Sequence, residues 1–137
     1  MMAELMERRL ATLFADLEEH VVTYVPTSSA HRRRRGYDQA ELLARALAGR
    51  TGLAFAHLLE RRRQKRTQVS LHPQQRMANV RDAFSLRPGA DRLHRGNVLL
   101  VDDVLTTGAT ARAAAETLAR AGVGRVALVT FARALPR

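Results

Sequence analysis

The sequence has 137 residues and is 46% hydrophobic, which suffices for one core of ordinary size but leaves no room for two domains of typical length. It contains no cysteine, which excludes disulfides, thiolate metal sites and a thiol nucleophile. The 23 Lys and Arg residues, all arginine except Lys65, outnumber the 13 Asp and Glu residues and give a formal net charge of +10, so anionic partners such as nucleic acid or phosphorylated metabolites are expected.

The N-terminal region has the pattern of an amphipathic helix and not that of a targeting segment. Apolar residues recur near helical spacing between residues 5 and 19, with acids and arginines between them. The first four residues include Glu4 and lack the basic-then-apolar order of a secretion signal. No apolar run approaches the roughly 20 residues needed to cross a bilayer. We expect a packing helix here and a cytoplasmic protein without a membrane span.

The next region alternates between a strand pattern and a helix pattern. The β-branched and aromatic run from Val21 to Val25, closed by Pro26, predicts a buried strand that ends in a loop over residues 27–36. Alanine and leucine dominate residues 37–50, and Gly52 follows closely. This composition and ending predict a helix.

A block of like charge occupies residues 60–66, with the sequence Glu-Arg-Arg-Arg-Gln-Lys-Arg. Because these charges would repel one another in a compact element, they predict an exposed, mobile loop. After Pro73, a helix-permissive stretch leads to residues 83–86, and Pro88-Gly89 then breaks the chain before the next strand.

The C-terminal third has the clearest elements. Residues 98–101 are uniformly apolar, as expected for a central parallel strand covered on both faces. Residues 109–120 predict a strong helix that ends at Gly122 and Gly124, and residues 126–131 predict a last strand. The alternation of strands and helices predicts an α/β fold with a mostly parallel central sheet flanked by helices.

Two adjacent carboxylates, Asp102 and Asp103, directly follow the apolar strand. In open α/β sheets, ligands sit beyond the carboxyl ends of the strands. Adjacent carboxylates repel each other and are costly to desolvate, so a sugar diol or a hydrated cation accounts for the pair better than a structural role does. Residues 106–110, Thr-Thr-Gly-Ala-Thr, then offer hydroxyls, a glycine and the N–H groups of a helix that starts near Ala109. This combination predicts a phosphate cradle.

One loop therefore combines acceptors for ribose hydroxyls with donors for a phosphate, which matches the two ends of a ribose 5-phosphate. Taken alone, Thr106 or Thr107 would be an ordinary helix N-cap, and the acidic pair is what favours a ligand. Neither the nucleotide-binding Gly-x4-Gly-Lys-Ser/Thr pattern nor the Rossmann Gly-x-Gly-x-x-Gly pattern is present.

The run from Val98 to Thr110, Val-Leu-Leu-Val-Asp-Asp-Val-Leu-Thr-Thr-Gly-Ala-Thr, resembles the motif with which type I phosphoribosyltransferases bind 5-phosphoribosyl 1-pyrophosphate. The block Arg-Gly-Tyr-Asp-Gln-Ala at residues 35–40 resembles the ComF competence family in particular. So does a scattered set of downstream residues: Gln68, Leu71, Arg76, Asn79, Ala83 and Phe84. The resemblance implies a type I phosphoribosyltransferase fold in a single domain over residues 1–137. Longer ComF-type proteins carry a cysteine-rich, zinc-binding segment upstream, and this cysteine-free sequence does not contain it.

The resemblance also implies roles for individual residues. Asp102 and Asp103, the candidate catalytic pair, would face the ribose hydroxyls. The 5-phosphate would be held by Thr106, Thr107, Gly108, Ala109 and Thr110. The pyrophosphate loop would run from Val25 to Ser29 and include Pro26, Thr27, Ser28 and Ser29. It has no internal Arg or Lys, so the nearest cations are those of residues 32–35.

A flexible basic loop would close over the pyrophosphate and exclude water, as such loops do in this family. Its candidate residues are Arg61, Arg62, Arg63, Lys65, Arg66 and Gln68. Mg²⁺ would enter with the donor, and no direct protein ligand to the metal is assigned.

The remaining reactive side chains form no recognised site. Neither Ser28 nor Ser29 lies in a Gly-x-Ser-x-Gly elbow, so both are loop residues or pyrophosphate donors, not nucleophiles. The five histidines show no metal-ligand spacing and are interpreted as solvated or structural. They are His20, His31, His57, His72 and His94.

Two functions of different classes remain open. In the first, the protein is a Mg²⁺-assisted phosphoribosyltransferase that displaces pyrophosphate from the anomeric carbon in favour of an unidentified acceptor. In the second, it is a non-catalytic competence module that binds single-stranded DNA or a DNA-uptake helicase. The aromatic content of 4%, without tryptophan, favours phosphate contacts over base stacking in any DNA complex. The arginine-rich surface leaves a homodimer open.

Overall fold

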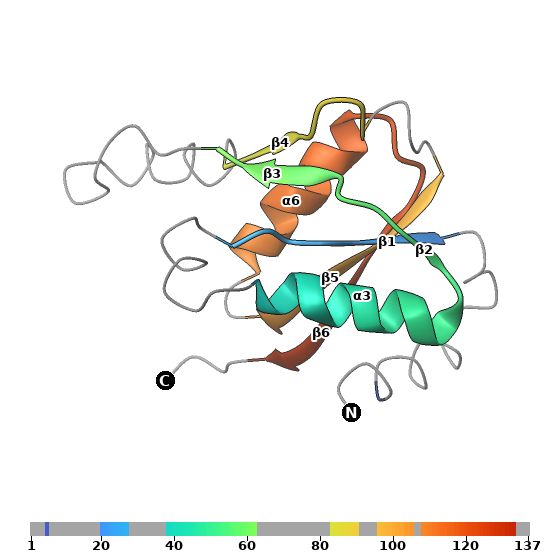
Figure 1. Cartoon of the computed structure of the whole chain (residues 1–137). Helices are drawn as coiled ribbons and strands as arrows, with labels where there is room; N and C mark the ends of the chain where they lie inside the picture. Colours follow the sequence, from blue (N-terminus) through green and yellow to red (C-terminus); the bar gives the residue numbers. More distant parts are fainter. Residues whose placement is uncertain are drawn as a thin grey trace, which may run out of the picture.

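A computed structural model describes residues 5, 20–27, 38–62, 83–90, 96–105 and 108–133, without the side chains of residues 104, 105 and 131–133. Its centre is a four-stranded parallel sheet with the strand order β2-β1-β5-β6 (Figure 1). These strands are β1 (His20–Tyr24), β2 (Ala54–Phe55), β5 (Asn97–Leu105) and β6 (Val126–Arg133). The predicted α/β class, with a mostly parallel sheet flanked by helices, is confirmed.

The two long helices of the described chain cover opposite faces of this sheet (Figure 1). Helix α3 (Gln39–Thr51) packs Leu43 and Leu47 against Leu99 of β5. Helix α6 (Ala109–Arg120) packs Leu118 against Leu100 of the same strand. Because successive side chains of a strand point to opposite faces, both faces of β5 need apolar residues, which explains its uninterrupted apolar run.

A second, antiparallel pair of strands lies on the α6 side of the sheet (Figure 1). It consists of β3 (Leu59–Arg61) and β4 (Phe84–Leu86), and it shares the apolar cluster of α6 through Leu59 and Phe84. The prediction that residues 60–66 form an exposed loop is wrong at its start, since Glu60 and Arg61 belong to β3. Pairing with β4 and contact with the Phe84 ring outweigh the mutual repulsion of the charges.

The predicted strands and helices of the described chain are confirmed, with shifted ends. The largest difference is that β5 continues to Leu105, so Asp102 and Asp103 belong to a strand and not to the predicted loop. The extension has a partner, because Asp102 pairs with Thr130 and the ladder continues to Leu105 opposite Arg133.

Only Leu5 of the predicted N-terminal helix is described, and it is helical and exposed. The helix-permissive stretch predicted after Pro73 lies outside the described residues, which resume at residue 83. Within the described part of the chain, neither helix has the length and apolar content that crossing a bilayer requires.

Candidate functional site

A cavity of about 180 Å³ lies where β1 ends and both long helices begin. The carboxyl ends of parallel strands are where α/β sheets commonly bind ligands. Ten residues from five separate stretches of the chain line it: Val25, Pro26, Thr27, Asp38, Gln39, Ala40, Arg61, Asp102, Asp103 and Thr110.

The cavity brings together members of each predicted binding segment. Asp102 and Asp103, Pro26 and Thr27, Thr110 and Arg61 all line it. Gly108 and Ala109 begin α6 beside it without being lining residues, and Arg62 is exposed. The other predicted residues lie outside the described part of the chain: Ser28, Ser29, Arg63, Lys65, Arg66, Gln68, Thr106 and Thr107.

The acidic pair is held in place by the strand that carries it. The backbone N–H of Asp103 donates to Asp102 Oδ1 at 3.0 Å. Burial raises the pKa of Asp102 to about 7, and the neighbouring charge of Asp103 contributes to the rise. At neutral pH this carboxyl is therefore close to its titration midpoint. A carboxyl so perturbed, in a cavity, is a candidate for ligand binding, since a cation or hydroxyl donors would stabilise its charged form.

Arg61 reaches the cavity from β3 and is the only cation among its described lining residues. Its Nη1 donates to the carbonyl oxygen of Pro26 at 3.3 Å, and its guanidinium carbon lies 5.3 Å from the centre of the Phe84 ring. Burial lowers the pKa of Arg61, and the charges of Asp102 and Asp38 oppose that shift. The arginine therefore places a positive charge next to the end of β1, where the predicted pyrophosphate loop lacks one.

Asp38 is a lining residue that was not among the predicted site residues. It is buried and caps α3, because its Oδ1 accepts hydrogen bonds from the backbone N–H groups of Ala40 at 3.1 Å and Glu41 at 3.4 Å. Its Oδ2 accepts from the N–H of Thr27 at 2.9 Å, which ties the end of β1 to the start of α3. An aspartate immediately before an alanine-rich helix is a recognisable N-cap signal in the sequence.

Helix α6 begins differently. Its N-cap is Gly108, which has a left-handed backbone with φ 85° and no side chain to bond to the first turn. The first-turn residue Thr110 lines the cavity. A helix start of this kind, with a glycine that lets a ligand approach the backbone, suits an anion.

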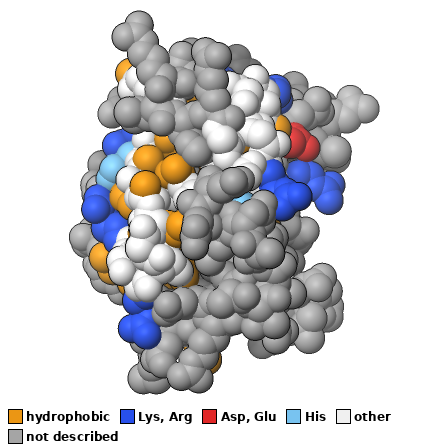
Figure 2. Space-filling model, turned by 90° about the vertical axis from the view of Figure 1, so that its right-hand side faces the viewer, with side chains coloured by type: hydrophobic (Ala, Val, Ile, Leu, Met, Phe, Trp, Pro, Cys, Tyr) orange, Lys and Arg blue, Asp and Glu red, His pale blue; other side chains and the backbone are white. Residues whose placement is uncertain are grey.

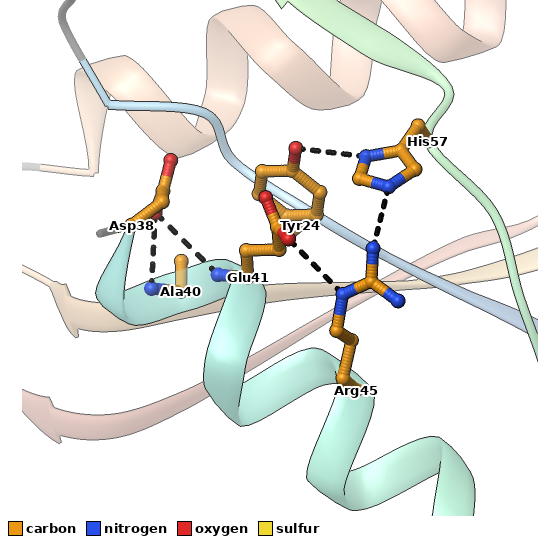
Figure 3. Close-up of polar contacts among 6 residues, drawn as sticks. All are labelled: Tyr24, Asp38, Ala40, Glu41, Arg45 and His57. Atoms are coloured by element: carbon orange, nitrogen blue, oxygen red, sulfur yellow. Dashed lines mark hydrogen bonds and ion pairs between the residues drawn. The ribbon is translucent and has the colours of Figure 1, made fainter. Parts of the chain in front are cut away.

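Behind the α3 wall of the cavity lies a polar cluster that sequence reasoning missed (Figure 3). Tyr24 Oη lies 3.0 Å from His57 Nδ1, and Arg45 Nη2 lies 2.8 Å from His57 Nε2. Arg45 also pairs with Glu41, with Nε 3.0 Å from Oε2. The prediction that His57 is solvated or structural agrees with this bonding, but the sequence holds no signal that joins residues from three separate segments.

Comparison with known proteins gives one matching domain family. The phosphoribosyl transferase domain matches residues 33–136, about three quarters of the chain. The protein is also 36% identical over 132 residues to DNA utilization protein YhgH of Salmonella typhimurium, covering 96% of this chain and 56% of that protein. Competence protein F of Haemophilus influenzae is 33% identical over 111 residues, covering 80% and 48% respectively. The chain thus spans about half the length of these curated relatives, and the predicted ComF resemblance is confirmed.

Among solved structures, the fold is similar to that of the B. subtilis glutamine phosphoribosylpyrophosphate amidotransferase complexed with ADP and GMP. The TM-score is 0.59 at 26% identity, and the match covers 95% of this chain and 26% of that one.

Proposed function

The chain belongs to the phosphoribosyl transferase domain family, and on this basis we propose that its cavity binds 5-phosphoribosyl 1-pyrophosphate together with Mg²⁺. One observation carries the proposal. A single cavity is lined by the acidic pair of β5, by Thr110 in the first turn of α6 and by Pro26 and Thr27 after β1. These groups suit ribose hydroxyls, a 5-phosphate and a pyrophosphate, and they come from distant parts of the sequence.

Each part of the donor has a chemically matched partner in this proposal. The carboxylates of Asp102 and Asp103 accept hydrogen bonds from the ribose hydroxyls. The 5-phosphate binds residues 106–110, where Gly108 permits close approach to the start of α6. The pyrophosphate lies along residues 25–29, beside the guanidinium of Arg61. We propose that a basic loop closes over the pyrophosphate, with the candidate residues Arg61, Arg62, Arg63, Lys65, Arg66 and Gln68.

Mg²⁺ fits this cavity as a companion of the donor. Proteins bind Mg²⁺ through one or two carboxylates together with substrate phosphates and water. The described residues offer Asp102 and Asp103 but contain no group of three or more His, Cys, Asp or Glu side chains that could hold a metal ion. When bound with the donor, Mg²⁺ would neutralise charge on the pyrophosphate.

We further propose that the bound donor reacts by phosphoribosyl transfer. The bond between the anomeric carbon and the pyrophosphate oxygen breaks, the acceptor nucleophile bonds to that carbon, and pyrophosphate leaves with the bonding electrons. Asp102 and Asp103 fix the ribose while positive charge develops on the ring. No covalent intermediate is required. The acceptor is unassigned, because no arrangement of the described residues reads a particular nucleobase.

Pyrophosphate release tests this reaction. The protein, donor and Mg²⁺ are incubated with a panel of nucleobases, beside a double variant with Asp102→Asn and Asp103→Asn. Glu116→Gln, an exposed change on α6 away from the cavity, is the matched control. We expect release with at least one base, its loss in the double variant and its retention in the control. If no base gives release above the rate without protein while the donor still binds, transfer to these acceptors is wrong.

A second function is favoured by the names of the relatives, which refer to DNA utilization and competence. In that case the domain binds single-stranded DNA, or a helicase that acts on it, and its net charge of +10 supplies phosphate contacts. At the end of the sheet opposite the cavity, the arginine side chains visible among the described residues lie in separate groups around hydrophobic side chains (Figure 2).

A salt titration on single strands of different sequence tests the DNA function. Contacts to phosphates alone predict that affinity falls steeply with salt and is nearly independent of sequence. A flat salt response or a strong preference for one sequence would contradict it.

A further inference from the structure

Four polar side chains form a continuous chain of contacts behind the cavity (Figure 3). Tyr24 comes from the end of β1, Glu41 and Arg45 from the first two turns of α3, and His57 from the connection between β2 and β3. His57 contacts both Tyr24 and Arg45, and Arg45 pairs in turn with Glu41. The cluster therefore joins three segments that all lead into the cavity.

The direction of each hydrogen bond follows from the chemistry of these groups. A guanidinium can only donate, so His57 Nε2, 2.8 Å from Arg45 Nη2, must accept. The imidazole is then neutral with its proton on Nδ1, and this N–H donates to Tyr24 Oη at 3.0 Å. The hydroxyl proton of Tyr24 is then available for a hydrogen bond to the carboxylate of Glu41.

The titration behaviour of Tyr24 and Glu41 agrees with this arrangement. Burial, together with the charge of Glu41 and a hydrogen bond to its carboxylate, raises the pKa of Tyr24 to about 12. Burial opposes ionisation of Glu41, but hydrogen bonds from Arg45 and Tyr24 outweigh it and lower the pKa of Glu41. The contacts thus run in a chain from Glu41 through Arg45 and His57 to Tyr24, and the mutual influence of Tyr24 and Glu41 on their pKa values indicates that the two ends of this chain lie near each other.

Aromatic packing fixes the orientation of the imidazole. The Tyr24 and Phe55 rings stack with an interplanar angle of 4° and a centroid distance of 6.1 Å. The His57 ring meets both edge to face, at 5.6 Å from Tyr24 and 5.1 Å from Phe55. The Arg45 guanidinium carbon lies 4.5 Å from the centre of the Phe55 ring. Rotation of His57 would disturb these contacts.

We propose that His57 is a positioning residue for the donor site, acting through Tyr24 on the end of β1 and through Arg45 and Glu41 on the first turn of α3. This inference rests on the proposed donor binding. Tyr24 directly precedes the lining residues 25–27, and Glu41 directly follows the lining residues 38–40. The hydrogen bond from Thr27 N–H to Asp38 Oδ2 joins the same two walls on the cavity side. His57 connects the end of β1 to α3 on the side away from the cavity, through its contacts with Tyr24 and Arg45.

Acidification would weaken the contact between His57 and Arg45. A proton on His57 Nε2 would face the N–H of Arg45, so the contact would change from a hydrogen bond to a repulsion between two cations. Among the described residues, the charged and titratable groups that act on Tyr24 or Glu41 are Asp38 and Arg45 of the α3 segment, His57, and Arg87 beyond β4. Donor affinity is therefore expected to fall on acidification by more in the wild type than in a variant without a titratable group at position 57.

Two substitutions separate hydrogen bonding from packing. His57→Gln keeps one acceptor for Arg45 and one donor for Tyr24, whereas His57→Leu removes both. Thr51→Val is the matched control, because it removes a 2.8 Å hydrogen bond from Thr51 Oγ1 to Leu47 O at the far end of the same helix. We expect His57→Leu to weaken calorimetric binding of donor and Mg²⁺ about five- to tenfold, with His57→Gln and Thr51→Val within about twofold of wild type.

Two readouts need no ligand. In ¹⁵N NMR spectra, neutral His57 should carry its proton on Nδ1. Amide exchange at Thr27 and Ala40 should accelerate in His57→Leu and not in His57→Gln. If the wild type binds no donor, the proposed function fails, and these readouts still test the chain of contacts through His57.

Three results would overturn the positioning role. They are a neutral Nε2–H tautomer, equal donor affinity of the Gln and Leu variants, and unchanged exchange in His57→Leu.

Discussion

The two long helices begin at the same end of the sheet, beside the same cavity, yet their first turns are built in opposite ways. Helix α3 starts at Asp38, whose carboxylate accepts hydrogen bonds from Ala40 and Glu41 of its own first turn. Helix α6 starts at Gly108, which has no side chain and a left-handed backbone. At α3 the protein supplies an anion to the helix start, whereas among the described residues no side chain caps the start of α6 and its first turn contains no acidic residue.

We infer from this difference that the two sides of the cavity, at the starts of α3 and α6, have separate roles. A helix N-terminus attracts negative charge, and at α3 the carboxylate of Asp38 already provides it. The start of α3 is also joined to the end of β1, by the hydrogen bond from Thr27 N–H to Asp38 on the cavity side and by the contacts of His57 with Tyr24 and Arg45 on the other side. The start of α6, next to the acidic pair, is the wall that we propose for the ribose 5-phosphate.

The largest effect is expected at the acidic pair. Asp102→Asn combined with Asp103→Asn should weaken binding of the donor at least about tenfold, because hydrogen bonds to charged groups contribute about 1.5–3 kcal/mol each. Calorimetric titration in the presence of Mg²⁺ measures the change. Affinity equal to that of the wild type would place the sugar elsewhere.

Asp102 should also make stability depend on pH. Burial raises the pKa of Asp102 from 3.8 to about 7, so the folded protein binds this proton more tightly than the unfolded chain does. The free energy of unfolding should therefore fall as pH rises from about 4 to about 7 and level off above that range.

Asp102→Asn tests this linkage. The variant should match the wild type below about pH 4 and be more stable above about pH 7, as measured by urea unfolding. Glu116→Gln, an exposed change, should keep the wild-type profile. A difference between Asp102→Asn and wild type that does not vary with pH would contradict the raised pKa.

A smaller effect, on stability, is expected at the α3 wall. Asp38→Ala removes the cap and the bond from Thr27, and should lower the free energy of unfolding by about 2 kcal/mol. Asp38→Asn should recover the contribution of the cap, because asparagine caps helices about as well as aspartate, but not the bond from the Thr27 N–H, which would meet an amide donor. If Asp38→Ala is as stable as wild type in urea, the contrast between the helix starts is wrong.

The smallest effect separates backbone strain from ligand contact. Gly108 and Gly122 have φ angles of 85° and 99° at the two ends of α6. Either residue changed to alanine should lose about 1 kcal/mol of stability, because L-residues disfavour this conformation. Only Gly108→Ala should also weaken donor binding, since Gly122 follows the opposite end of α6 and does not line the cavity. Equal affinities of the two variants would remove Gly108 from the phosphate site.

The most local features of the molecule could be predicted from the sequence. The apolar run of residues 98–101 and the alanine-rich helix 109–120 contain their own signals, and the acidic pair is conspicuous between them. The end of β5 could not be predicted in the same way. Asp102 and Asp103 belong to the strand because β6 runs alongside as far as Arg133, and a partner strand is not visible in local sequence.

The cavity side chains show the same limit. Arg61 belongs to a strand because Phe84, distant in sequence, lies opposite it. The pairing of His57 with Tyr24 and Arg45 likewise depends on how β1, β2 and α3 meet. Asp38 did have a local signal, since it precedes an alanine-rich helix, but its second bond, to Thr27, arises only in the folded chain.

A crystal structure of the protein with saturating 5-phosphoribosyl 1-pyrophosphate and Mg²⁺ tests the central claim most directly. We expect the ribose hydroxyls against Asp102 and Asp103, the 5-phosphate against residues 106–110 at the start of α6, and the pyrophosphate between residues 25–29 and Arg61. A 5-phosphate at the start of α3, or a cavity without donor at saturating concentration, would contradict it.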